Sequence, residues 1–316
     1  MNSLSIIIPT RCRGKALIKN IQLLKKYIEE NEQSEFVSII ISDNGSPIND
    51  YNEAEQFIKN VNGVDISLYR QKENIGFERN LLFLLSKVES RFVMLLGDDD
   101  YLSPGYFRKV LFYINEVPDI AGIVPNYYQV NEHREKISET RDEIGEDKIY
   151  SDDLALAIVS RAHQMSGLVF DMATEFVSAY KGCNIDNVYP QIYFLGFSAL
   201  HGKIAHVLSE PIENTVLVKK NFTYEFDNLF DQMIINIDAL NLESVRKKNA
   251  LSSFCDYHKD RFINPNTKRH PFKFILRVLH EYRVSLMTKR LIISHFICFY
   301  LTYFSHRHLK AMLEVI

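Results

Sequence analysis

The sequence has few of the features that define secreted, disulfide-bonded or membrane-spanning proteins. Among its 316 residues are no tryptophan and only four cysteines, which are scattered and form no C-x-x-C pair. The N-terminus lacks the charged and long apolar regions of a signal peptide, because a short strand-like run begins at once. Both absences favour a reducing, cytoplasmic setting.

Charge and hydropathy exclude two further classes. The net charge of −3 gives no reason to expect a nucleic-acid partner. The apolar run at 291–304 contains Ser294 and His295 and is too short and polar for a bilayer span. The ten histidines form no metal-ligating set, because His201 and His206 are five positions apart and do not share a helical face.

Over the first 130 residues, short apolar runs alternate with amphipathic segments. The runs predict strands at 4–8, 36–41, 64–69, 92–96 and 120–124. Helices are predicted at 16–28, 51–61 and 77–85, and from Ser103-Pro104 to about 115, where Ser103 is the N-cap. This alternation is typical of an α/β fold with a parallel, doubly wound sheet.

Polar clusters follow four of the predicted strands: Thr10-Arg11, Asp43-Asn44, Asn74 and Asp98–Asp100. Ligands of such sheets bind at the carboxyl ends of the strands. We therefore expect the four loops to converge on one binding site.

The aspartate run is the strongest chemical signal. Asp98, Asp99 and Asp100 repel one another unless a positive charge or open solvent compensates. Mg²⁺ or Mn²⁺ would compensate by binding one or two carboxylates together with phosphate oxygens of a substrate. The alternative is an acidic helix N-terminus, although Ser103 already supplies a cap.

The other loops are ambiguous by themselves. The Asn44-Gly45 turn is compatible with a binding loop or with a simple tight turn. Arg79 would face a phosphate, an aspartate or solvent. The basic residues Arg11, Arg13 and Lys15 suit an anionic diphosphate but also a solvated surface.

Taken together, these motifs resemble a known family. Pro9-Thr10, Asp43-Asn44-Gly45-Ser46, Asn74-Ile75-Gly76 with Arg79-Asn80, and the stretch from Gly97 to Pro104 are similar in order and spacing to family 2 glycosyltransferases. The resemblance covers residues 3–125, and the Gly-Asp-Asp-Asp form is most similar to the bacterial O-antigen and capsule branch, including abequosyltransferase-like enzymes.

The resemblance implies a GT-A fold, with a Rossmann-like, mostly parallel sheet flanked by helices and a smaller, mainly helical C-terminal region. It implies inverting, metal-dependent transfer of a sugar from a nucleotide-sugar donor to a glycan or undecaprenyl-linked saccharide. The alternatives are a nucleotidyltransferase and a non-catalytic protein that binds nucleotide sugars.

The resemblance also assigns residues. Donor-binding positions are Pro9, Thr10, Arg11, Asp43, Asn44, Asn74, Gly76, Arg79, Asp98 and Asp99. Many family members begin the acidic run with aspartate, where this chain has Gly97, so Mg²⁺ or Mn²⁺ is expected at Asp99 and Asp100.

An inverting enzyme needs a carboxylate base near the acceptor hydroxyl. The resemblance places it about eleven residues before a glycine-basic turn, and counting back from Gly202-Lys203 gives Gln191, which is not an acid. Asp186 is the substitute that we predict, with Glu175 and Asp171 as competitors. Each of the three would also suit a solvated or capping role.

We expect a catalytic domain at 1–218, with a nucleotide-sugar half at about 1–130 and an acceptor half at about 131–218, and a polar loop at 133–151. A helical domain at 219–316 follows.

Between 268 and 310, nine Lys or Arg residues accompany one acid, Glu281. This pattern is compatible with peripheral contact with an anionic membrane, at the inner face of the plasma membrane. It is equally compatible with a core helix or a homo-oligomer contact.

Overall fold

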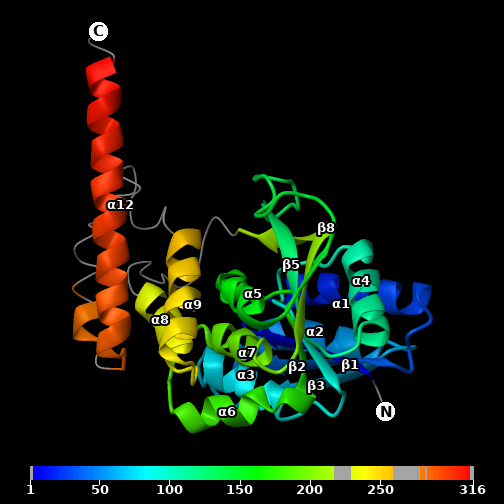
Figure 1. Ribbon diagram of the computed structural model, residues 1–316. Coiled ribbons are helices and arrows are strands. Elements are labelled where there is room, and N and C mark those ends of the chain that lie inside the picture. Colours follow the sequence, from blue (N-terminus) through cyan, green and yellow to red (C-terminus); the bar gives the residue numbers. More distant parts are fainter. Residues whose placement is uncertain (1–2, 217–228, 259–275, 277, 282, 314–316) are drawn as a thin grey trace.

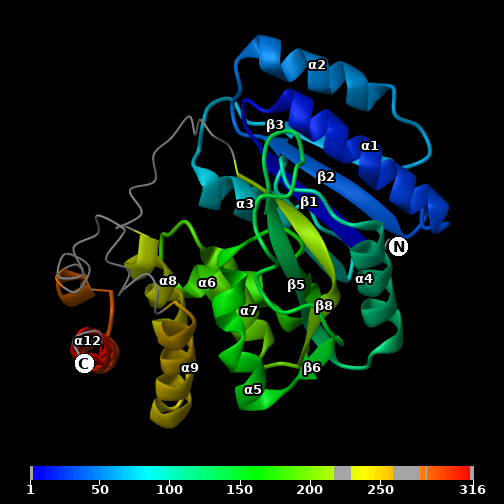
Figure 2. The same cartoon turned by 90° about the horizontal axis from the view of Figure 1, so that it is seen from above.

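The computed structural model describes residues 3–216, 229–258, 276, 278–281 and 283–313, which are built around one eight-stranded sheet (Figures 1 and 2). The strands are β1 (Leu4–Thr10), β2 (Val37–Asp43), β3 (Asp65–Arg70), β4 (Phe92–Leu95), β5 (Ile120–Val130), β6 (Lys148–Tyr150), β7 (Val169–Asp171) and β8 (Lys203–Thr215). Their order is β3-β2-β1-β4-β7-β5-β8-β6. Only β6 and β7 run antiparallel to their neighbours, so the predicted mostly parallel sheet is confirmed.

Helices follow most strands. The α-helices are α1 (Gly14–Glu30), α2 (Ile48–Lys59), α3 (Phe77–Leu85), α4 (Pro104–Glu116), α5 (Asp152–Ala157), α6 (Phe176–Cys183), α7 (Pro190–Ser198), α8 (Leu229–Asp238), α9 (Ser244–Tyr257) and α12 (Leu286–Leu313). Ser103 caps α4 as predicted, since its hydroxyl accepts a hydrogen bond from the Tyr106 N–H at 3.0 Å. The polar stretch at 133–151 carries one short edge strand, β6, which the sequence did not predict.

Both faces of the sheet are buried. In β1, Ile6 and Ile8 pack into a cluster with α1, α2 and α4, whereas Ile7 packs into a second cluster with α3, α6 and α7. Because each face is covered by helices (Figure 2), the strand has no solvent side and is apolar at successive positions.

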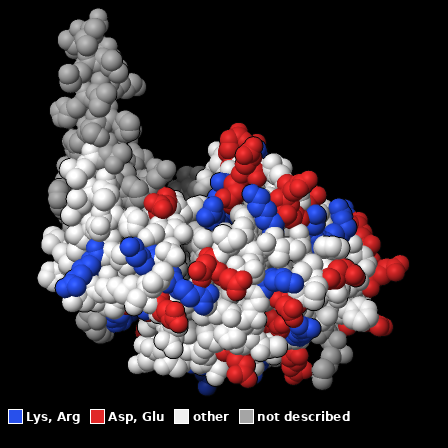
Figure 3. All heavy atoms as spheres, viewed as in Figure 1, with Lys and Arg blue, Asp and Glu red and all other residues white. Residues whose placement is uncertain are grey.

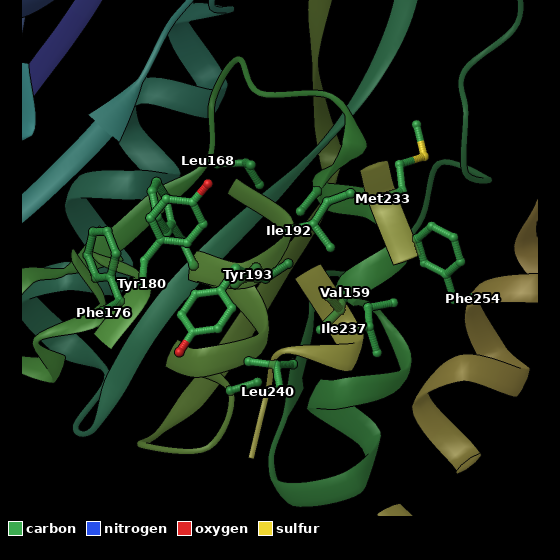
Figure 4. Packing of buried hydrophobic residues seen from close by; sticks show 14 of the residues in the cluster. Val159, Leu168, Phe176, Tyr180, Ile192, Tyr193, Met233, Ile237, Leu240 and Phe254 are labelled. Carbon is green, nitrogen blue, oxygen red and sulfur yellow. The ribbon is translucent and has the colours of Figure 1, made fainter. Parts of the chain in front are cut away.

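The helices after the sheet share its second core. Met233 and Ile237 of α8 and Phe254 of α9 belong to the same buried cluster as Ile192 and Tyr193 of α7 (Figure 4). The predicted boundary at 218/219 falls within 217–228, which lie outside the described residues, so the division into two domains stays a prediction.

Helix α12 packs against α9 and extends beyond the rest of the molecule (Figure 1). Within the described part of the chain, no helix is long and apolar enough to cross a bilayer. Residues 268–275, 277 and 282 of the predicted basic segment lie outside the described residues.

Candidate functional site

A cavity of about 600 Å³ opens at the carboxyl ends of β1, β2 and β4. Nine of the residues predicted from the sequence line it: Pro9, Thr10, Arg11, Asn44, Asn74, Gly76, Asp98, Asp99 and Asp100. The four polar loops therefore meet at one site, for the reason that the strand pattern suggested.

The first aspartate of the run is a buried anchor. Asp98 accepts a hydrogen bond from Thr10 Oγ1 at 2.7 Å and one from Arg13 Nη1 at 2.9 Å. Thr10 ends β1 and Arg13 precedes α1, so Asp98 ties the first loop to the end of β4. Its role in the structure is to fix the wall of the cavity.

The third aspartate is more fully engaged. Asp100 Oδ1 accepts from Asn214 Nδ2 at 3.0 Å and from the Thr215 N–H at 2.7 Å. Asp100 Oδ2 accepts from Gln164 Nε2 at 3.0 Å and from the Ser166 hydroxyl. With both oxygens occupied and only 5% of the residue exposed, Asp100 would have to release protein donors before it could bind a metal ion.

The middle aspartate differs from both. The Asp99 side chain is 16% exposed and lies 2.8 Å from Arg13 Nη1. Burial, followed by the negative charges of Asp100 and Asp98, raises the pKa of Asp99 to about 8. Among the three carboxylates, Asp99 is the one placed to meet a ligand in the cavity.

Gly97, which precedes the three aspartates, lies close to the side chains of Ser166 and Asp100. A Cβ atom at this position would lie 3.0 Å from Ser166 Oγ and 3.1 Å from Asp100 Oδ2. Asn20 Nδ2 also donates to the carbonyl oxygens of Gly97 and Asp100, at 3.0 and 2.8 Å. A side chain at position 97 would therefore have to displace Ser166 or Asp100, which disfavours an acid where many family members carry aspartate.

The loops after β2 and β3 form another part of the cavity wall. Asn44 Nδ2 donates to Asn74 Oδ1 at 2.9 Å, and the Ile75 N–H donates to Asn44 Oδ1 at 2.9 Å. Gly45 has φ +71°, and a Cβ atom there would lie 2.5 Å from the Glu73 carbonyl carbon. Glycine is therefore required where these loops touch.

Two predicted donor residues lie outside the cavity wall. Asp43 is buried and accepts hydrogen bonds from the Ser46 N–H and hydroxyl, so it closes the turn. Arg79 is exposed on α3, and its charge contributes to lowering the pKa of Asp186. The neighbouring Asn80, rather than Arg79, lines the cavity.

The predicted base also lies outside it. Asp186 is exposed, and its carboxylate is hydrogen-bonded to Glu78, which lowers the pKa of Asp186. Of the competitors, Asp171 pairs with Arg91 at 3.0 Å, and Glu175 precedes α6 in a left-handed conformation. Neither Glu175 nor Asp171 lines the cavity.

Sequence reasoning missed the remaining wall of the cavity. It is formed by His163, Gln164, Met165, Ser166, Val188, Tyr189 and Gln191. Only Gln191 had a sequence signal, since the spacing to Gly202-Lys203 singled it out.

Comparison with known proteins shows the family of this chain. The sequence profile of glycosyl transferase family 2 matches residues 5–176. The chain belongs to glycosyl transferase family 2. The resemblance noted in the sequence is thus confirmed at the level of the family. A comparison with curated protein sequences found no match.

Several solved glycosyltransferases share the fold. S. aureus TarS (residues 1–349) has a TM-score of 0.64 and 15% identity over 98% of this chain and 92% of that one. Its complex with UDP-GlcNAc has a TM-score of 0.61 and 16% identity over 93% and 79%. The mannosyltransferase PcManGT from Pyrobaculum calidifontis, bound to GDP-Man and Mn²⁺, has a TM-score of 0.52 and 8% identity over 96% and 87%. These likenesses confirm the GT-A fold.

The family 2 site depends on local rather than global charge. On the face shown in Figure 3, basic and acidic side chains are interspersed, without a broad surface of one sign. In the cavity, Arg13 is the cation that contacts the aspartates.

Proposed function

We propose that the chain transfers a sugar from a nucleotide-sugar donor, whose diphosphate binds beside Asp98–Asp100, to a saccharide acceptor. The observation that carries this proposal is the convergence of the loops after β1, β2 and β4 on one cavity of about 600 Å³. That volume lies within the range of small-molecule sites. Arg11 and Arg13 line the cavity and supply positive charge for a diphosphate.

A divalent cation fits this site through Asp99. Mg²⁺ is typically bound by one or two carboxylates, and substrate phosphates and water complete its octahedron. Asp99 faces the cavity with Arg13 as its ion-pair partner, whereas the oxygens of Asp100 are already used by Gln164, Ser166, Asn214 and Thr215. No cluster of three metal-ligating side chains occurs among the described residues. We therefore propose Asp99 as the protein ligand of Mg²⁺ or Mn²⁺, which would neutralise charge on the departing diphosphate.

This chain's own residues would orient the donor. Thr10 and Arg13 hold Asp98, and the two asparagines Asn44 and Asn74 hold the loops after β2 and β3 in contact. The family resemblance assigns donor-binding roles to Thr10 and Asp43. Thr10 lines the cavity, whereas Asp43 would act through the turn that it closes with Ser46. An inverting transfer with Asp186 as base is part of the proposal, and Asp186 would then act on an acceptor hydroxyl from outside the wall of the cavity.

The cellular setting is proposed from the sequence resemblance. We propose a role in bacterial surface polysaccharide (O-antigen or capsule) synthesis, with a glycan or undecaprenyl-linked saccharide as acceptor. The basic composition of 268–310 supports a cytoplasmic enzyme held at the inner face of the plasma membrane, with a homo-oligomer contact as the alternative use of this segment.

The decisive experiment is a thermal-shift panel of UDP-, GDP-, CDP- and dTDP-sugars with Mn²⁺ or with EDTA, followed by assay of nucleotide release. Ligand that binds the folded state raises the melting temperature according to its concentration and affinity. We expect one nucleotide to stabilise the protein selectively and in a metal-dependent way. Stabilisation without release of nucleotide would favour the non-catalytic alternative, and no stabilisation by any donor would contradict the proposal.

A further inference from the structure

Gln191 is a buried polar residue in the wall of the cavity. It is the second residue of α7, is 2% exposed and follows Tyr189, which lines the same wall. A polar side chain buried at this level normally has its hydrogen bonds satisfied.

Only one end of its amide group is satisfied. Gln191 Nε2 donates a long hydrogen bond to the His163 carbonyl oxygen at 3.4 Å, and because a carbonyl can only accept, this contact favours the amide orientation that places the nitrogen beside His163. Gln191 Oε1 is buried and has no hydrogen-bond partner within the described part of the chain. An unsatisfied buried acceptor costs about 1–3 kcal/mol. Because Gln191 is one of the residues that line the cavity, a ligand bound there is a source of the missing donor.

The chemistry of Gln191 Oε1 selects the ligand group. Diphosphate oxygens are hydrogen-bond acceptors at neutral pH and would be repelled by Gln191 Oε1. A sugar hydroxyl can donate to it. The amide itself cannot take up a proton in this pH range, so Gln191 is suited to hold a hydroxyl in position and unsuited to deprotonate it.

The position of Gln191 relates it to the donor sugar. Asp100 Oδ2 accepts a hydrogen bond from Gln164 Nε2 at 3.0 Å. The carbonyl oxygen of the adjacent residue, His163, accepts a hydrogen bond from Gln191 Nε2. The transferred sugar is covalently attached to the diphosphate, which we have placed at the aspartates. We propose that Gln191 Oε1 accepts a hydrogen bond from a hydroxyl group of the transferred sugar and so helps to select the donor; this inference rests on the proposed function.

The environment also explains why an acid is absent. A glutamate in this orientation would place a carboxylate oxygen beside the His163 carbonyl, where both groups only accept hydrogen bonds. This part of the wall therefore favours an amide over a carboxylate, and Gln191 is a positioning residue.

The test compares two affinities for each protein variant. Binding of UDP and UDP-GlcNAc, and of GDP and GDP-Man, is measured by calorimetry for the wild type, Gln191→Met and the control Gln56→Met on the exposed face of α2. The pair that binds the wild type is then used. Gln191→Met should weaken the nucleotide sugar about three- to tenfold, the size expected for one neutral hydrogen bond, and leave the bare nucleotide within twofold.

The outcomes separate this inference from the proposed function. If Gln191→Met keeps the wild-type ratio of nucleotide affinity to nucleotide-sugar affinity, the inference about Gln191 is overturned and the proposed function is unaffected. A Gln191 that contacts only the acceptor would give this result. If the wild type binds neither pair, nor any other donor of the panel, the proposed function fails first. Gln191→Asn, which keeps an amide but shortens it, serves as a second variant if Gln191→Met does not fold, and it should show the same selective loss.

Discussion

Arg13 Nη1 lies 2.8 Å from Asp99 Oδ2, and the same nitrogen lies 2.9 Å from Asp98 Oδ1. One guanidinium therefore neutralises part of the negative charge of a site with three carboxylates, all of them buried or partly buried. Because Asp98 and Asp100 have other protein donors, the contact with Arg13 is most easily exchanged for a ligand at Asp99.

The first prediction concerns Asp99→Asn. We expect at least a hundredfold loss of sugar transfer and loss of the metal-dependent part of nucleotide binding, since the amide is a poor ligand for a hard cation. The unliganded protein should keep its melting temperature or gain, because burial and the neighbouring charges of Asp100 and Asp98 already disfavour the charged form of Asp99, as its raised pKa shows. Activity and thermal shift with and without Mn²⁺ measure this, with the exposed Asp256→Asn on α9 as control. Transfer at the wild-type rate would rule out Asp99 as the metal residue.

The second prediction concerns Asp100→Asn, which should act on stability. Both carboxylate oxygens accept hydrogen bonds, so either orientation of an amide would place an NH₂ group against a protein donor. We expect a loss of about 2–4 kcal/mol in the free energy of unfolding, measured with urea. A variant as stable as Asp99→Asn would show that the hydrogen bonds to Asp100 are unimportant.

The part of the cavity formed by the loops after β1, β2 and β4 was predictable because it follows from local sequence. β1 ends at Thr10, β2 ends directly before Asn44 and β4 ends three residues before Asp98, and parallel strands bring their carboxyl ends to one edge. The orientation of individual side chains was less accessible. Asp43 and Arg79 each adjoin a residue that lines the cavity, but Asp43 turns back to Ser46 and Arg79 lies on the exposed side of α3.

The other wall could not be predicted because its placement depends on distant pairing. The three-residue strand β7 inserts antiparallel between β4 and β5 and thereby brings Ser166 and Gln164 to Asp100. Neither the length nor the composition of 163–171 predicts this insertion, because a strand so short has no clear periodicity.

The third prediction uses the pH dependence of Glu78, whose carboxyl is hydrogen-bonded to Asp186 and to the hydroxyl of Tyr180. Burial, followed by the hydrogen bond with Asp186, raises the pKa of Glu78 from 4.5 to about 7. The folded protein therefore holds a proton that the unfolded chain releases, so this contribution is complete below pH 4.5 and disappears as the pH rises through about 7. The pKa of Asp186 is lowered, so its opposite contribution changes only at more acidic pH.

Glu78→Gln should flatten this dependence. A pKa shift of this size corresponds to about 3 kcal/mol in the free energy of unfolding. Because the carboxyl is half exposed and screened by solvent, we expect a contribution of about 1 kcal/mol. Urea unfolding at pH 5 and pH 8 measures the difference for the wild type and the variant. An equal slope in both proteins would show that Glu78 titrates normally.

The last prediction concerns Gly97→Asp, which installs the acid found in many family members. The new Cβ atom would lie 3.0 Å from Ser166 Oγ and 3.1 Å from Asp100 Oδ2, and the new charge would face Asp100. We expect a loss of about 1–3 kcal/mol in the free energy of unfolding from overpacking, with further loss from charge repulsion. Donor binding should weaken as well, because the displaced Ser166 and Asp100 both line the cavity. Gly145→Asp is the matched control, since a Cβ atom at Gly145 meets nothing within 4 Å. If Gly97→Asp matched this control in stability and donor affinity, the close contact with Ser166 and Asp100 would not be the reason for glycine at position 97.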